Sequence, residues 1–240
     1  MNSEINSAKK HKRKLFDYFW YDFVKVTGGP PTWLWLRPKV YHVGDKAKHR
    51  PKGGVLIVSN HIGFVDVIQL MAVFWRRRLH FLATSDLYRS KRWEKFWDAV
   101  HCIRVDKQNF SMHSFHTVAD CLKEGKAVAI FPEGGVNTEG NALRTFKSGV
   151  VLMAHIGGAP IQPVYLVERK KWYHRSIAIL GDPIDLREML GERPSMAELN
   201  AANEYLHERE LELERYYHGQ IAKDRPVDAS DKSNEEIKIH

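Results

Sequence analysis

The chain has 240 residues and a mass of 27.9 kDa, and 43% of its residues are hydrophobic, which is enough for one large α/β domain with a sizeable core. Its formal net charge of +8 requires an anionic partner: nucleic acid, an anionic membrane surface or a phosphorylated substrate. Two cysteines, with no CxxC pair, exclude a disulfide framework and suit a reducing compartment.

The chain begins with a polar stretch and continues into an aromatic one. Residues 1–14 end in a dense run of cations and are predicted to be flexible, as is the charged tail at 225–240. Nine aromatic residues then fall within 15–41. The Gly-Gly-Pro-Pro sequence at 28–31 is predicted to break this segment into two short elements.

A basic run followed by Trp and Tyr is typical of segments that lie at a membrane interface. In residues 15–26 the aromatics occupy most sides of a helix, which favours membrane contact over packing by one aromatic face. A nucleic-acid arm fits less well because of the large apolar content. We expect a helical membrane-contacting segment at 15–41, and a peripheral protein on the cytoplasmic face of a membrane. We expect neither a signal peptide nor a membrane-spanning helix.

From about residue 55, strand and helix patterns alternate. The patterns predict strands over 55–59, 79–83, 102–106, 127–131, 161–167 and 176–180. They predict helices near 64–78, 89–99, 110–124 and 145–156, and a C-terminal helix over 196–221. This order predicts an α/β fold with a mixed, largely parallel central sheet covered by helices, in one main domain over 42–224.

The first candidate site follows the strand at 55–59, where His61 and Asp66 are spaced as HxxxxD. If His61 lies in the turn and Asp66 in the first helical turn, the carboxylate can reach Nδ1–H of the imidazole and orient a general base. The alternative is a surface histidine with an Asp that stabilises the helix start. The spacing alone is weak, because His101 and Asp106 repeat it in an extended segment, where their side chains would point to opposite faces.

The second candidate site follows the strand at 127–131, where Glu133 stands in Pro-Glu-Gly-Gly. Both segments follow the carboxyl ends of strands, and ligands bind at that edge of an open α/β sheet. Gly134 and Gly135 permit close backbone approach and supply N–H donors for an anion. A simple Pro-Gly turn is the alternative.

Two further groups of polar residues are interpreted as structural. His113, His116 and Asp120 could share one helix face as metal ligands, but an exposed polar face is the commoner explanation, and no metal site is expected. Cys102 beside His101 suggests a thiol nucleophile, yet adjacent strand residues face opposite ways, so Cys102 is assigned to packing.

Together these motifs resemble the glycerolipid acyltransferase family, whose best-known members acylate lysophosphatidic acid. Asn60-His61 with Asp66 matches the family's NHxxxxD motif, and the FPEG motif is present at 131–134. The segment 146–149 matches FKxG, and 161–164 is similar to the later proline-containing strand. Four blocks in the right order over about 55–167 are far more specific than HxxxxD alone.

The resemblance implies acyl transfer from a thioester, on CoA or acyl carrier protein, to a lysolipid hydroxyl, with no cofactor. His61 would be the general base and Asp66 its orienting partner, with no covalent acyl-enzyme. Backbone N–H groups near the turns would bind the oxyanion. The substrate-binding residues implied are Asn60, Arg104, Lys107, Glu133, Gly134, Gly135 and Arg144.

The chain departs from the family pattern at two places. Gly135-Val136-Asn137 stands where Thr-Arg-Ser commonly follows FPEG, so an expected arginine is lost, and Arg104 and Arg144 are the candidates to restore its charge. His101 and Arg104 replace a more usual glycine and a phenylalanine or proline. The acceptor therefore stays open among lysophosphatidic acid, another lysolipid and another polar acceptor, and a non-catalytic membrane protein on the same scaffold is the further alternative.

Overall fold

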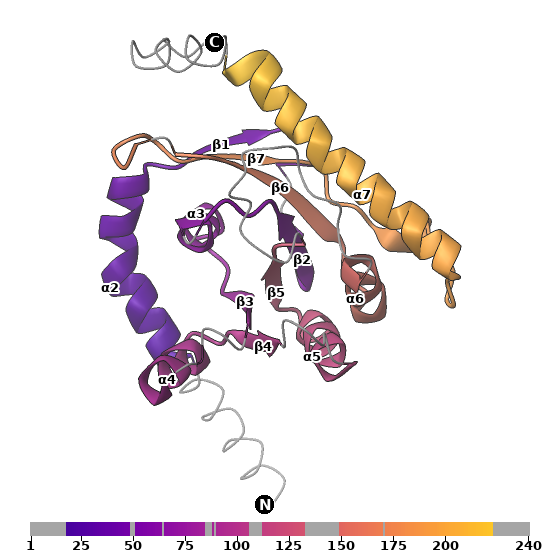
Figure 1. Cartoon of the computed structure of the whole chain (residues 1–240), viewed down its shortest axis with the longest axis horizontal. Coiled ribbons are helices and arrows are strands. Elements are labelled where there is room, and N and C mark those ends of the chain that lie inside the picture. The colour runs from indigo at the N-terminus through magenta and orange to yellow at the C-terminus, as the bar shows by residue number, and fades with distance from the viewer. Residues whose placement is uncertain are drawn as a thin grey trace, which may run out of the picture.

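The computed structural model describes residues 18–48, 51–63, 65–84, 88, 90–105, 112–132, 149–169 and 171–222. Within these ranges the strands form one seven-stranded sheet in the order β1-β7-β6-β2-β5-β3-β4 (Figure 1). The strands are β1 (Lys39–His42), β2 (Val55–Ser59), β3 (Leu79–Thr84), β4 (Ile103–Val105), β5 (Ala127–Ile130), β6 (Ile161–Val167) and β7 (Ile177–Leu180).

Every neighbouring pair of strands is parallel except β6 and β7, which are antiparallel. The mixed, largely parallel sheet predicted from the sequence is therefore confirmed. Strands β2, β5, β6 and β7 are buried along their whole length, which explains the apolar runs of β2, β5 and β7. In β6 the run is interrupted by the buried Gln162, whose side chain donates to the carbonyl of Gly181.

Helices cover both faces of the sheet (Figure 1). The helices are α2 (Phe19–Leu36), α3 (Val65–Val73), α4 (Lys91–Ala99), α5 (Met112–Lys123), α6 (Gly149–Gly157) and α7 (Met196–Tyr216), with short turns η2 (Leu186–Glu188) and η3 (Tyr217–Ile221). Helices α5, α6 and α7 pack on the face that carries Leu56 and Val58. Helix α3 packs on the opposite face, which carries Val55 and Ile57, and α2 lies along the outer side of α3.

The predicted break at 28–31 is wrong, because α2 runs through both prolines as one helix of 18 residues. A proline removes an N–H that would bond four residues back, to the carbonyls of Val26 and Thr27. Both of those residues are exposed, so water can bond their carbonyls instead. A side chain at Gly29 would overlap the ring of Trp75, so this glycine lets α2 approach the turn after α3. The motif is a packing contact within a helix.

Helix α2 runs from the amino ends to the carboxyl ends of the parallel strands. Near its start, the hydroxyl of Tyr21 accepts a hydrogen bond of 2.8 Å from the backbone N–H of Leu79, at the beginning of β3. At its end, the carbonyl of Leu36 accepts one of 2.8 Å from Ser176, immediately before β7. The chain then forms β1, which pairs with β7 and was not predicted from the sequence. Four residues of mixed polarity give too short a pattern to indicate a strand.

His101, just before β4, has a positive φ of 56°. This left-handed conformation favours glycine, which accounts for the glycine expected at this position from the family resemblance. The histidine ring lies 4.3 Å from the ring of Tyr18, and its carbonyl accepts a hydrogen bond of 3.1 Å from Nδ1 of His80. The replacement therefore adds an aromatic contact between β4 and the start of α2.

The buried ring of His80 links fold stability to pH. Burial lowers the pKa of His80 to about 4, with smaller lowering contributions from Lys126 and His101, while the bond to the His101 carbonyl opposes the change. Its side chain is neutral in the folded protein and is protonated more readily in the unfolded chain. The stabilisation is therefore complete above pH 6.5 and is lost as the pH falls from 6.5 towards 4.

We expect the free energy of unfolding to fall by about 2 kcal/mol between pH 7 and pH 5 through His80 alone. The variant His80→Asn, whose side-chain amide can still donate to the His101 carbonyl, should lose this component of the pH dependence. Urea titrations at both pH values measure the difference. His218→Gln, at an exposed histidine, is the matched control and should show the wild-type change in the free energy of unfolding between the two pH values. If His80→Asn showed that same change, His80 would not be its source.

Candidate active site

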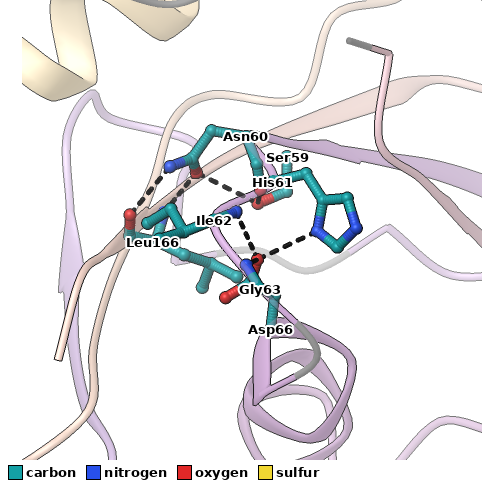
Figure 2. A network of polar contacts seen from close by, with 7 residues as sticks. All are labelled: Ser59, Asn60, His61, Ile62, Gly63, Asp66 and Leu166. Carbon is teal, nitrogen blue, oxygen red and sulfur yellow. Dashed lines mark hydrogen bonds and ion pairs between the residues drawn. The ribbon is translucent and has the colours of Figure 1, made fainter. Parts of the chain in front are cut away.

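The site begins where β2 ends. Strand β2 finishes at Ser59, and Asn60 to Gly63 form an irregular turn before α3 starts at Val65 (Figure 2). Asp66 falls in the first turn of α3 and is only 3% exposed. His61 is partly buried, so a substrate at this edge can reach its ring. The predicted placement of His61 in the turn and Asp66 in the helix is confirmed.

One oxygen of Asp66 holds the turn together. Its Oδ2 atom lies 3.0 Å from Nδ1 of His61, and it accepts backbone hydrogen bonds of 2.6 Å from Ile62 and 2.8 Å from Gly63 (Figure 2). The carboxylate thus stabilises the turn and the helix start while it orients the imidazole. The same oxygen therefore orients the imidazole and stabilises the start of α3, whereas action of His61 as a general base stays a prediction.

This geometry determines how the histidine can act. An ionised carboxylate only accepts hydrogen bonds, so the pattern assigns the proton of the neutral imidazole to Nδ1. Nε2, on the far side of the ring, is then the nitrogen with a lone pair that can accept a proton from a hydroxyl. The His61 and Asp66 pair therefore has the arrangement of a general base with its orienting partner.

Phe131 brings the second motif to the first. Its ring stacks on the ring of His61, with 4.2 Å between centroids and 17° between planes. The register explains the contact, because Val58 of β2 pairs with Ile130 of β5, and both chains leave the sheet at the same level. The predicted approach of the two segments is confirmed for Phe131. We expect the stack to restrict rotation of the imidazole.

Asn60 has a different set of partners from the predicted one. Its side chain is buried, and it donates to the carbonyl of Leu166 at 2.9 Å and accepts from the N–H of Leu166 at 2.7 Å (Figure 2). Both ends of the amide are therefore engaged with β6. In these contacts Asn60 positions the turn that carries His61, and substrate contact by its amide stays a prediction.

Arg104 lies at the same edge of the sheet, on β4. The pairings through β5 and β3 place it level with Phe131, three strands along from β2, which is roughly 14 Å at ordinary strand spacing. Its guanidinium lies 4.8 Å from the ring of Tyr88 and 3.8 Å from a carboxylate oxygen of Glu94. It is half exposed, so a bound anion could replace the weak ion pair with Glu94.

Similar proteins agree with the motif assignment. A family model described as Acyltransferase matches residues 40–167. The 1-acyl-sn-glycerol-3-phosphate acyltransferase of Bacillus subtilis is 32% identical over 181 residues, which cover 73% of this chain and 87% of that protein. A probable 1-acyl-sn-glycerol-3-phosphate acyltransferase of Mycoplasma genitalium is 30% identical over 152 residues, which cover 60% of this chain and 55% of that protein.

This chain belongs to the glycerolipid acyltransferase family. The crystal structure of PlsC from Thermotoga maritima, a 1-acyl-sn-glycerophosphate (LPA) acyltransferase, has the same fold. The TM-score is 0.57 at 18% identity, and the match covers 91% of this chain and 99% of that one. The family and fold class predicted from the sequence are thus confirmed. Within the part of the chain that the structure describes, no helix is both long and apolar enough to cross a membrane.

The structure tests only part of the predicted acyltransferase site. It brings His61 and Asp66 together and places Arg104 at the same edge. Lys107, Glu133, Gly134, Gly135 and Arg144 lie outside the described residues, as does Asp106 of the repeated spacing. Two contributors were missed: Phe131, which the FPEG motif contains, and the backbone of Leu166, which only the pairing of β6 with β2 could indicate.

Cys102 is held as a thiol away from this chemistry. Burial raises the pKa of the Cys102 thiol to about 12, and the nearby Asp98 adds to the rise. A thiol is a nucleophile only as thiolate, so this residue is inert near neutral pH. The interpretation of Cys102 as a packing residue agrees with this environment.

Asn60 provides a test of the turn. Asn60→Ala leaves the N–H and carbonyl of Leu166 without their side-chain partners in a buried place, so we expect a loss of roughly 2–3 kcal/mol in the free energy of unfolding. Denaturant titration measures it. Asn200→Ala, at an exposed position of α7, is the control and should change stability by under about 0.5 kcal/mol. Equal stability of both variants would contradict the positioning role.

Proposed function

We propose that this acyltransferase moves a fatty acyl group from an acyl thioester to the hydroxyl of lysophosphatidic acid and so forms phosphatidic acid. The single observation that carries the proposal is the His61 and Asp66 pair at the carboxyl edge of the sheet, stacked against Phe131 of FPEG. The names of the relatives from Bacillus subtilis and Mycoplasma genitalium support the acceptor. The acyl donor is acyl-CoA or acylated acyl carrier protein.

In the proposed reaction His61 is the general base. Nε2 takes the proton of the lysolipid hydroxyl while Nδ1–H stays bonded to Asp66, and the carboxylate stabilises the imidazolium that forms. The alkoxide oxygen attacks the thioester carbonyl, the carbon–sulfur bond breaks, and the imidazolium returns its proton to the departing thiolate. No protein nucleophile is required, which agrees with the inert environment of Cys102.

The oxyanion needs donors other than the N–H groups of Ile62 and Gly63. The sequence predicted that N–H groups of the turns would bind the oxyanion. Those of Ile62 and Gly63 already donate to Asp66, so they are not available for this role. We assign this role instead to the N–H groups around Gly134 and Gly135, which follow Phe131 along the chain. Glu133 would orient the acceptor, while Arg104, Lys107 and Arg144 would meet its phosphate.

The proposed acceptor is a membrane lipid, so we place the protein at the cytoplasmic face of a membrane, and the exposed side chains of α2 support the membrane contact. The helix buries only Tyr21 and Leu36 in the domain. Its exposed apolar side chains are Phe19, Trp20, Phe23, Val24, Val26, Trp33, Leu34 and Trp35. With a net charge of +8, such a helix suits the interface of an anionic bilayer.

The base assignment is tested by His61→Ala. A general base typically contributes ~10²–10⁴-fold to a rate, so we expect thiol release from acyl-CoA with lysophosphatidic acid to fall at least about 100-fold. His218→Ala, at an exposed histidine of η3, is the matched control and should keep the wild-type rate. Circular dichroism confirms the fold of each variant. A folded His61→Ala protein with a near wild-type rate would overturn the mechanism.

The phosphate assignment is tested by Arg104→Gln. Loss of one charge at a phosphate should raise KM for lysophosphatidic acid about tenfold while leaving kcat within a few-fold, because the contact persists throughout the reaction. Arg92→Gln, at an exposed arginine of α4, is the matched control. For a lysolipid acceptor without a phosphomonoester, the two variants should have the same KM. If the KM values of Arg104→Gln and Arg92→Gln agree for lysophosphatidic acid, Arg104 does not bind its phosphate.

A panel of acceptors with one acyl thioester decides the acceptor itself. Lysophosphatidic acid should give the highest kcat/KM, with glycerol 3-phosphate and other lysophospholipids below it. Preference for another lysolipid would replace the acceptor and keep the mechanism. Vesicle binding without thioester consumption for every acceptor would instead indicate a membrane-binding protein on this scaffold.

A further inference from the structure

A second group of exposed aromatic side chains lies outside the N-terminal segment, in the connection between β6 and β7. Trp172 is 75% exposed and Tyr173 is 47% exposed. They stand beside the end of α2, where Trp33, Leu34 and Trp35 are also exposed. We call these five side chains the edge surface.

The edge surface lies at the catalytic edge of the sheet. Val167 ends β6 and pairs with Ile177 at the start of β7, so the described residues between them, 168–169 and 171–176, project beyond the carboxyl end of β6. The end of α2 reaches the same place, through the hydrogen bond from Ser176 to Leu36. Figure 1 shows this connection beside that end of the helix. At the same edge, Asn60 ties the His61 turn to Leu166.

Polar contacts hold the two parts of the edge surface together. Nε1 of Trp35 donates to the carbonyl of Trp172 at 2.9 Å, and Arg37 donates to the carbonyl of Tyr173 at 2.7 Å. The guanidinium of Arg169 lies 4.5 Å from the ring of Trp35 and also bonds the carbonyl of Trp172. Segments 136 residues apart are therefore fixed to each other while their rings face solvent.

The charge around the edge surface is strongly positive. The described residues of 168–175 contain three cations, Arg169, Lys171 and Arg175, and one Glu, and Arg37 adds a further cation from the end of α2. Nζ of Lys171 lies 5.8 Å from the ring of Tyr173. Exposed Trp and Tyr among long basic side chains match the boundary between anionic headgroups and acyl chains. An acidic protein partner would match the charge but would leave the exposed rings and Leu34 unexplained.

We infer that the edge surface docks on an anionic bilayer and turns the catalytic edge of the sheet towards it. Trp172 and Tyr173 enter the interface together with the end of α2, while neighbouring cations meet the headgroups. The inference rests on the proposed function, because a membrane-resident acceptor is what makes this orientation useful. It adds a second contact, from the middle of the chain, that determines which way the domain faces.

The double variant Trp172→Ala/Tyr173→Ala of the full chain tests this contact by flotation with vesicles of phosphatidylcholine and phosphatidylglycerol. Removal of two partly inserted rings should weaken partitioning at least about tenfold. Trp172→Phe/Tyr173→Phe keeps most of the apolar area and should restore binding to near the wild-type value. Lys171→Gln should weaken binding about fivefold on these vesicles and little on pure phosphatidylcholine.

The matched control is Met196→Ala/Tyr205→Ala on α7. Met196 is 65% exposed, and Tyr205 is 37% exposed with the guanidinium of Arg209 5.1 Å from its ring, so it resembles Tyr173 with Lys171. This control should bind vesicles like the wild type. Thermal unfolding of each variant verifies that it is folded.

Activity separates this inference from the proposed function. With a short-chain lysophosphatidic acid below its critical micelle concentration, the aromatic double variant should release thiol at the wild-type rate, and with vesicle-embedded acceptor it should be slower. If the wild type acylates no acceptor, the proposed function fails while the flotation result still decides the docking surface. Wild-type vesicle binding by the folded double variant would overturn the inference. If this variant also bound acyl carrier protein less tightly or no longer self-associated, the edge surface would be a protein contact and not a lipid contact.

Discussion

One carboxylate oxygen, Oδ2 of Asp66, holds the His61 turn in place. It accepts hydrogen bonds from Nδ1 of the imidazole and from the backbone N–H groups of Ile62 and Gly63, so any change in the turn also changes the position of the imidazole. The N–H groups of Ile62 and Gly63 would otherwise lack a partner before the helix, and the Asp66 carboxylate that accepts from them also interacts favourably with the helix dipole. The five-residue spacing of His61 and Asp66 follows from this geometry. The histidine must stay in the turn for its ring to meet a carboxylate on the first helical turn.

The rest of the sheet supports this turn from both sides. On one side Asn60 bonds both backbone groups of Leu166 on β6, and on the other Phe131 leaves β5 to stack on the His61 ring. Both neighbours are parallel to β2, so all three chains leave the sheet at one edge. Parallel pairing thus brings segments that are 70 or more residues apart to the turn that carries one imidazole.

The sequence was sufficient for elements with a strong local pattern and insufficient for those that depend on a distant partner. Apolar runs predicted β2, β5 and β7, because strands buried on both faces are mostly apolar, and β6 was predicted in spite of its buried Gln162. β1 was missed, because only its pairing with β7 makes it a strand. The break in α2 was predicted wrongly because proline and glycine rules are local, whereas Gly29 is fixed by Trp75. The His61 contact was predictable only after the turn was placed between strand and helix.

Helix α2 relates the fold to the proposed membrane site. It begins beside the start of β3 and ends beside the start of β7, so it crosses the domain from the edge opposite His61 to the edge that holds it. A helix that only anchored the chain could leave the domain free to rotate above the bilayer. In the proposed membrane-bound state, the contacts of Trp35 and Arg37 with the backbone of Trp172 and Tyr173 would remove that freedom. The same contacts would then determine both where the domain binds and which edge of its sheet meets the lipid.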